Sequence, residues 1–194
     1  IMPSLVGSEM CIRDRGAALG TGTTMDFEMI GGTHELLPND VLQKLMYKSL
    51  TEINGFSYNN EEKGFAEKIS KTLEKPLNMK YVNGVEPYDP NALPMGSTDV
   101  GDVSFMVPTA GMSAATWVPG TPAHSWQAVA SGGTSIGNKG MVVAAKTLAL
   151  TALKLIDDPK IIEKAHTEFI QKRGKDFKYI PLLGDREPAL NYRN

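Results

Sequence analysis

The sequence predicts an α/β fold in which helices cover a buried sheet. Two short runs, 103–107 and 114–118, are rich in β-branched and aromatic residues, as are strands inside a covered sheet. Several segments carry the apolar spacing or the capping residues of helices, and the longest of them spans about 135–156. Because strands and helices alternate along the chain, we expect a layered α/β domain.

Bulk composition restricts the classes of function. The chain has 194 residues, a formal net charge of −2, a pI near 6.0 and 41% hydrophobic residues, which fits one ordinary globular domain. Since there is no basic stripe, a nucleic-acid partner is not expected. No membrane partner is expected either, because Lys139, Lys146 and Lys154 interrupt the longest apolar run before it reaches the ~18 residues of a membrane span.

Ten of the first fifteen residues match a laboratory sequence. Residues 5–14 are identical to one reading frame of a transposon-derived adaptor used in sequencing libraries. We therefore expect residues 1–15 to be a read-through scar and exclude them from the fold prediction; the alternative is a native, disordered N-terminus. The single cysteine, Cys11, falls within the scar, so no disulfide is expected. On this interpretation the natural N-terminus is missing and the chain is a fragment.

The first predicted elements are a strand and two helices. Alternating polar and apolar residues over 23–30 predict a half-exposed strand, which two glycines separate from the rest of the chain, as in the last strand of another domain. A helix over 39–53 follows, with Asn39 as its N-cap and Asp40 in its first turn. A second amphipathic helix begins near Asn60.

The second half of the chain contains the longest predicted helix. Residues 76–95 are rich in Pro, Asn, Asp and Gly, and they predict a loop. After the two buried strands, 131–133 form a flexible approach to the helix over 135–156, which is apolar nearly all round apart from one lysine edge. An Asp-Pro pair at 158–159 begins the last helix, and Gly174 ends it before an extended tail.

The strongest candidate for chemistry is His124, which lies in a turn rich in proline and glycine over 119–122. Proline fixes φ and glycine permits close approach, so such a turn favours presenting a side chain over burying it. An exposed imidazole can bind a metal ion or transfer protons, and structural or surface roles are the alternatives. A catalytic zinc site needs about three protein ligands. The other histidines are not at ligand spacing, since His34 is expected at a hinge and His166 on a helix surface.

Two other motifs admit more than one interpretation. Asp99 and Asp102 lie on a glycine-containing turn, where aspartates either act in catalysis or cap the turn through its own backbone. The glycines between 132 and 140 resemble a phosphate-binding loop, but the lysine and the hydroxyl residue are not at the required positions. We expect this segment to be a helix start capped by Thr134 or Ser135.

Three motifs together resemble one known family. They are GSTDVGDVS at 96–104, PGTPAHSWQ at 119–127 and TSIGNKGMVVAAKTLA at 134–149. Through them the chain from about Gly16 onward resembles the C-terminal half of the amidohydrolase and metallopeptidase family that includes the aminoacylases. The resemblance implies a three-layer catalytic domain, with a mixed sheet between helices, preceded by the last strand of a lid domain that forms dimers. The implied limits are 16–36 for the end of the lid and 37–194 for the C-terminal half of the catalytic domain.

The resemblance also implies a site. Members of this family hold two divalent metal ions, zinc or manganese, and His124 matches their last metal ligand. Asp99 matches an acid beside the site, which implies a supporting role behind the metal ligands. Gly120 and Thr121 would offer backbone N–H groups to a substrate carboxylate. The base glutamate, the other ligands and most of the lid would lie upstream of Gly16, so no catalytic residue is expected within the chain itself.

The activity implied by the resemblance is metal-assisted amide hydrolysis. The substrates would be N-acyl or N-aroyl amino acids, such as aminobenzoyl-glutamate, or small peptides, and the chain alone would be inactive. Implied partners are this small-molecule amide substrate and a second copy bound through the lid, with a different second subunit as a further option. A cytoplasmic location is expected. The alternative from another class is a non-catalytic relative that acts as a binding or regulatory subunit.

Overall fold

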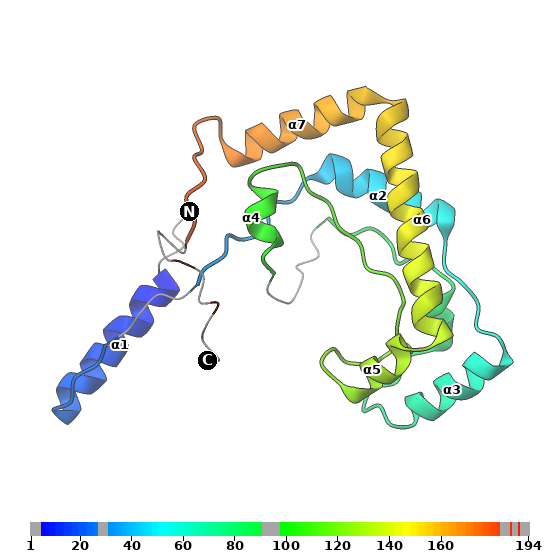
Figure 1. Cartoon of the computed structure of the whole chain (residues 1–194), viewed down its shortest axis with the longest axis horizontal. Coiled ribbons are helices and arrows are strands. Elements are labelled where there is room, and N and C mark those ends of the chain that lie inside the picture. The colour runs from blue at the N-terminus through cyan, green and yellow to red at the C-terminus, as the bar shows by residue number, and fades with distance from the viewer. Residues whose placement is uncertain (1–4, 27–30, 91–97, 183–186, 188–189, 191–194) are drawn as a thin grey trace. The chain divides into compact units, whose positions relative to one another are not determined.

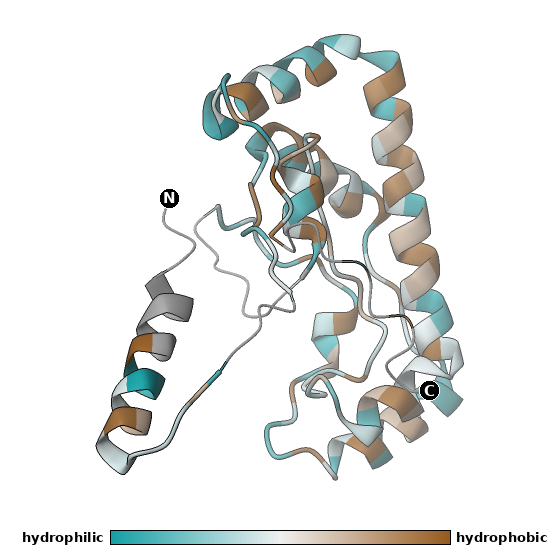
Figure 2. Cartoon of the chain, turned by 60° about the vertical axis from the view of Figure 1, so that its left-hand side comes forward, coloured by the Kyte–Doolittle hydropathy of each residue, from teal (hydrophilic) through white to brown (hydrophobic). Residues whose placement is uncertain are grey.

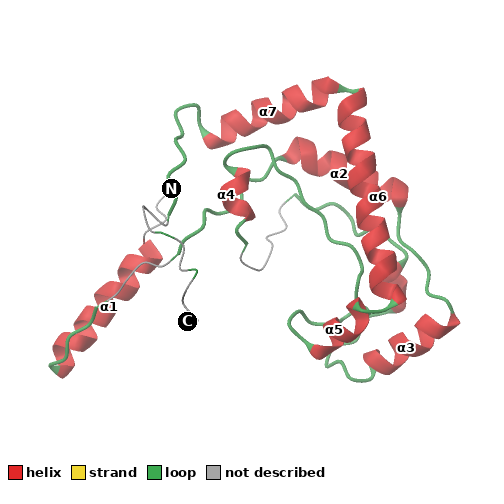
Figure 3. Ribbon diagram, in the orientation of Figure 1, coloured by secondary structure: helices red, strands yellow, loops and turns green. Residues whose placement is uncertain are grey.

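The computed structural model of the chain describes residues 5–26, 31–90, 98–182, 187 and 190. Every regular element within these ranges is a helix, and Figure 3 shows helices joined by loops. The chain divides into two compact units. Unit 1 comprises Ile1–Leu37, Gly96–Met106 and Asp176–Asn194, and unit 2 comprises Pro38–Met95 and Val107–Lys175.

The predicted sheet is wrong for the described part of the chain. The run 103–107 lies at the end of helix α4 (Val100–Ser104) and in the turn after it, and 114–118 is a loop that pairs with no strand. Residues 23–26 of the expected lid strand form no strand either, and its remaining residues, 27–30, lie outside the described ranges. The three-layer domain with a mixed sheet, preceded by a lid strand, is therefore not found there.

The two runs were predicted as strands because apolar and β-branched residues indicate burial, and burial does not require a sheet. Phe105 and Val118 are 5% and 1% exposed, so each run places one large apolar side chain in a packed interior, whereas Val103, Met106 and Val107 are about half exposed. Phe105 packs beside aromatic rings and Val118 packs among helices, without a sheet at either place. Strand propensity mostly measures how well a side chain fits a half-buried surface. A run of four or five apolar residues therefore cannot distinguish a strand from a buried loop.

All four predicted helices are present in unit 2. They are α2 (Asp40–Ile53), α3 (Asn60–Ser70), α6 (Ser135–Asp157) and α7 (Pro159–Arg173). Asn39 caps α2 by accepting a hydrogen bond from the Leu42 N–H, as predicted, and Asp158 caps α7 before its initial proline. Gly174 ends α7 with a φ of 91°.

Several short elements differ from the prediction. The segment expected as a flexible approach, 131–133, begins inside helix α5 (Trp126–Gly132). The loop expected over 76–95 includes a 3₁₀ turn, η1 (Met79–Val82), and its last residues, 91–95, lie outside the described ranges. Such single turns are too short to show a helical period, so local sequence does not reveal them.

The helices of unit 2 meet in two places. α2 packs against α6, and α7 contacts both, as Figure 1 shows. Around α3, η1 and the start of α6 lies the main apolar core. Its buried members are Tyr58, Ala66, Ile69, Val82, Val118 and Ile136. Since Val118 belongs to this core, the loop that follows Val118 starts from a fixed point.

Glu62 joins α3 to α6 inside this core. Its side chain is 4% exposed, and it completes a capping box by accepting from the Asn59 N–H at 2.7 Å. The same carboxylate accepts from Lys139 Nζ at 2.6 Å and from the Ser135 hydroxyl at 2.7 Å. These hydrogen bonds, that from Lys139 above all, lower the pKa of Glu62 from 4.5 to about 2 although burial raises it. The Lys139 side chain, expected at a wet edge, is 36% exposed and at the same time pairs with this buried carboxylate.

Glu168 of α7 caps the first turn of α2. Its two carboxylate oxygens accept from the backbone N–H groups of Asp40 and Val41, at 2.8 and 2.9 Å. Burial raises the pKa of Glu168, but hydrogen bonds from Lys172 and from these two amides outweigh burial and hold the pKa below its usual range. Beside them the Asn39 amide donates to the Ala165 carbonyl at 2.8 Å. The N-terminus of α2 is thus built from two distant segments.

Unit 1 contains helix α1 (Leu5–Thr21) and α4. α1 begins within the segment that we attribute to an adaptor. The domain limits of 16–36 and 37–194 stay predictions, as does the scar. Among the described residues, none of the helices combines the length and the apolar character that crossing a membrane requires.

We expect Glu62→Gln to destabilise the chain by about 1–3 kcal/mol, because it removes the charge that accepts hydrogen bonds from Lys139 and Ser135. The folded pKa of Glu62 is depressed, so its contribution is full above the unfolded value of 4.5 and is lost as the pH falls toward 2. Urea unfolding of the chain across this pH range, at low protein concentration, measures the effect.

The matched control is Glu61→Gln, since Glu61 is exposed and lies on the same helical turn. It should change the free energy of unfolding by less than about 0.5 kcal/mol. An equal loss of stability in both variants would show that Glu62 contributes no more than a surface carboxylate.

Candidate functional site

The loop over 117–125 is anchored at its first half. The Leu77 N–H donates to the Pro119 carbonyl at 3.4 Å, which ties the loop to the segment after α3. The Thr121 N–H donates to the Val118 carbonyl at 3.1 Å and closes a turn. Because Val118 is buried in the core, this turn is fixed to the body of unit 2.

Gly120 is required in this turn for two reasons. Its φ is 88°, in a region that residues with a side chain rarely adopt. A Cβ atom at this position would also lie 2.7 Å from the Lys75 carbonyl oxygen and 2.8 Å from the Leu77 nitrogen. The glycine therefore permits both the bend and the close approach of the two backbones.

His124 follows in a left-handed conformation, with a φ of 57°, which is uncommon for a residue with a side chain. The next residue, Ser125, stabilises this bend, since its hydroxyl donates to the Pro122 carbonyl at 2.7 Å. The same oxygen accepts from the Ala128 N–H at 3.2 Å and caps α5. The His124 imidazole is exposed, and it forms no hydrogen bond or ion pair within the part of the chain that the structure describes.

The sequence prediction missed the role of Ser125. The available signal was its position, because a serine directly before a helix is a preferred N-cap. Because α5 was not predicted from the sequence, no capping role was assigned to Ser125. The structure shows that one hydroxyl both begins α5 and holds the bend at His124.

The two aspartates lie in unit 1. Asp99 is exposed and precedes α4 without capping it through its side chain. Asp102 accepts a hydrogen bond from the Tyr179 hydroxyl at 3.0 Å and lies 4.0 Å from His34 Nε2. Asp102 therefore makes tertiary contacts within unit 1. Both aspartates belong to unit 1, and His124 belongs to unit 2.

The motif that contains these aspartates also packs α4 against the chain near His34. A Cβ atom at Gly101 would lie 1.8 Å from the His34 carbonyl oxygen, so only glycine allows this approach. Ser104 is fully buried, and its hydroxyl accepts from the Leu37 N–H at 2.8 Å and donates to the Gly101 carbonyl at 2.6 Å. Part of this motif therefore has a packing role.

Neither of the other two histidines belongs to a group of three or more metal-ligating side chains in the part of the chain that the structure describes. The His34 ring lies 5.2 Å from that of Phe105 and 5.6 Å from that of Tyr179, in an aromatic cluster of unit 1. His166 is exposed on α7, which matches the prediction of a surface position.

The glycine-rich segment before α6 is a capped helix start, as predicted. Thr134 is the N-cap of α6, and its hydroxyl oxygen accepts from the Ile136 N–H at 3.2 Å. The same hydroxyl donates to the Ser131 carbonyl at 2.7 Å. The near match to a phosphate-binding loop therefore has a local structural explanation.

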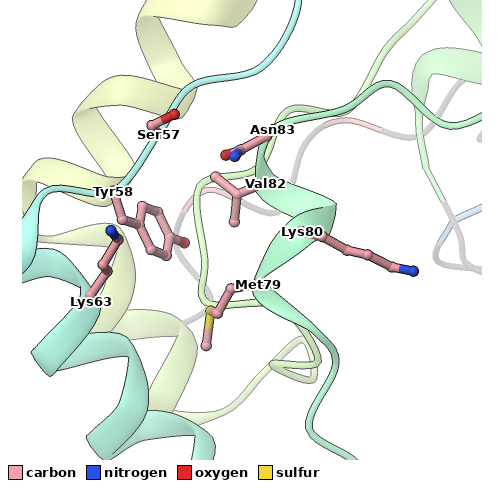
Figure 4. Close-up of a pocket in the computed structure, with 7 residues that line it drawn as sticks. All are labelled: Ser57, Tyr58, Lys63, Met79, Lys80, Val82 and Asn83. Atoms are coloured by element: carbon pink, nitrogen blue, oxygen red, sulfur yellow. The ribbon is translucent and has the colours of Figure 1, made fainter.

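A small pocket lies between η1 and the segment before α3, and it contains none of the predicted site residues. Its volume is about 220 Å³, and Figure 4 shows its lining, which includes Tyr58, Lys63 and Met79. The Tyr58 hydroxyl is buried without a hydrogen-bond partner among the described residues. Burial, with the nearby charge of Glu62, raises the pKa of Tyr58 to about 12. Lys80 extends away from the other side chains in Figure 4, so the polar groups do not converge.

A metal ion would find one ligand in the His124 loop. Within the described ranges, no three His, Cys, Asp or Glu side chains gather in a way that could hold a metal ion. A free imidazole on an anchored turn suits one position of a zinc or manganese site. Within the described ranges the loop therefore offers a single imidazole to a metal ion, with no second ligand gathered beside it.

Comparison with known proteins confirms the resemblance predicted from the three motifs. The chain is 35% identical to one subunit of the p-aminobenzoyl-glutamate hydrolase of Escherichia coli (strain K12) over 200 aligned residues, which cover 90% of this chain and 41% of that protein. It is 32% identical to Xaa-Arg dipeptidase of Mus musculus over 158 residues, which cover 80% of this chain and 30% of that protein. The chain thus spans less than half the length of these curated relatives. No family model and no solved structure matches it.

We expect Gly120→Ala to loosen the anchored turn, because the new methyl group meets the Lys75 carbonyl and the left-handed φ is strained. The local cost should be about 1–3 kcal/mol. The Leu77 amide donates to the Pro119 carbonyl, so its hydrogen exchange measures the loosening of the turn. This exchange should become faster in the variant. Gly111→Ala is the control, since a Cβ atom there meets nothing within 4 Å. Unchanged exchange in the Gly120 variant would contradict the anchoring.

Proposed function

Because its curated relatives are named as hydrolases, we propose that this chain is part of a metal-dependent amidohydrolase. One relative is named for p-aminobenzoyl-glutamate and the other for Xaa-Arg dipeptides. Both kinds of substrate carry an amide bond beside an amino acid. We therefore propose as substrates N-acyl or N-aroyl amino acids, such as aminobenzoyl-glutamate, or small peptides.

One observation supports this proposal from within the chain, namely the exposed His124 imidazole on an anchored bend. In the proposed site, a ring nitrogen of His124 would bind one of two divalent metal ions, zinc or manganese. Such ions, when bound, polarise the scissile carbonyl and acidify a water molecule. His124 positions that chemistry because its backbone is held by Ser125 on one side and by the turn at Gly120 on the other.

Two further parts of the chain have proposed supporting roles. Gly120 and Thr121 would face the substrate carboxylate with their backbone N–H groups. The Thr121 amide already donates to the Val118 carbonyl, so the Gly120 amide is the better donor of the two. Asp99, whose carboxylate is exposed and caps no helix, would orient a metal ligand by hydrogen bonding.

The remaining ligands, the base glutamate and most of the lid would belong to the longer protein. We further propose that this longer protein is cytoplasmic and forms a homodimer through its lid. The bacterial relative is named as one subunit of its hydrolase, which supports a different second subunit as a partner.

Removal of the His124 ring tests the proposed site. In the longer protein that carries this chain, His124→Ala should lower the bound metal, because one nitrogen ligand is lost. Hydrolysis of aminobenzoyl-glutamate should fall by at least about 100-fold. Elemental analysis and a steady-state assay measure the two effects.

The control is His166→Ala, since this histidine is also exposed but lies on α7. It should leave both metal content and rate unchanged. Unaltered metal content in the His124 variant would remove this residue from the site. A wild-type longer protein that binds no metal and hydrolyses no amide would favour the non-catalytic relative.

A further inference from the structure

The first turn of α6 buries Ile136 in the apolar core, but beyond that turn the helix buries mainly small and hydroxyl residues. The face turned toward the rest of unit 2 carries small and hydroxyl residues, among them Gly140, Thr147 and Thr151. Thr147 is fully buried and Thr151 is 6% exposed, and their hydroxyls donate to backbone carbonyls one turn earlier. These side chains bury little apolar area, whereas an amphipathic helix normally turns its most hydrophobic stripe to the core.

The opposite face of α6 is apolar and exposed. Its residues, which we call the α6 stripe, are Met141, Val142, Ala145, Leu148, Ala149, Ala152, Leu153 and Ile156. They lie on neighbouring turns and extend for about 22 Å along the helix. Exposed Lys146 borders the stripe, since it lies four residues after Val142 and three before Ala149. Figure 2 shows brown, hydrophobic bands over much of the long helix α6, with hydrophilic bands between them.

Exposure along the stripe is high. Leu148, Leu153 and Ile156 are 53%, 56% and 71% exposed, although α2, α5 and α7 all pack against α6. These neighbours therefore use other faces of the helix. A contiguous exposed apolar patch of this length is typical of a surface that another element covers.

We propose that the α6 stripe is the docking surface for an apolar part of the longer hydrolase that this chain does not span. This inference rests on the proposed function in one respect, that the chain is part of a longer protein. The chain spans 41% and 30% of its two curated relatives, so more than half of each has no counterpart here. The large exposed side chains of the stripe are apolar, so burying them favours an apolar partner surface, with Lys146 left at its edge.

Thiol labelling tests the proposal with a matched pair of positions. Leu148 in the stripe and Ile162 on α7 are 53% and 51% exposed, so Leu148→Cys and Ile162→Cys should react alike in this chain once Cys11 is replaced by serine. In the longer protein, Leu148→Cys should react at least about 10-fold more slowly than Ile162→Cys. Mass spectrometry of the labelled peptides resolves the two sites. Ala152→Cys, which adds one sulfur atom, gives a second measurement with little risk to folding.

Each outcome decides the proposal. Equal labelling in the longer protein would overturn it, because the stripe would then be open to solvent. Protection that disappears on dilution would also overturn it and would assign the stripe to contact between two copies. Protection that does not change with concentration supports it. Protection together with an inactive wild-type protein would sink the proposed function and leave the docking surface in place.

Discussion

The buried carboxylate of Glu62 is the contact on which the organisation of unit 2 depends. It completes the N-terminal cap of α3 and binds Lys139 and Ser135 at the start of α6, so two helices far apart in sequence are held at one point. A buried charge is costly unless its oxygens are satisfied, and here protein donors satisfy both oxygens. The apolar core that includes Ile136 and Val118 packs around this junction.

The candidate site depends on this core through a short series of local constraints. Val118 fixes the beginning of the loop, Gly120 lets it bend against the segment near Lys75, and Ser125 closes the turn that presents His124. Each step uses a backbone group or a small hydroxyl, which leaves the imidazole as the exposed functional group. The same unit leaves the hydrophobic face of α6 uncovered. We propose that a longer polypeptide completes a site at the exposed imidazole and covers the apolar face of α6.

The wrong prediction of a sheet shows where sequence patterns lose their meaning. The runs at 103–107 and 114–118 contain the residue types of buried strands, and Phe105 and Val118 are indeed buried. Neither run is long enough to reveal a period, and neither is flanked by another strand within the described ranges. Short helices fail for the same reason, which is why α5 was not predicted and the role of Ser125 was missed with it.

The amino-acid sequence alone was enough to place the main helix boundaries, because capping depends on residues within about three positions of one another. Asn39, Thr134 and Asp158 cap the helices that their positions predict. The motifs around His124 likewise sufficed for the resemblance. The three-dimensional packing was needed to show that Glu168 of α7 caps the distant start of α2 and that the richest apolar face of α6 is exposed. Burial is set by what surrounds a residue, and a sequence pattern describes only the residue and its neighbours along the chain.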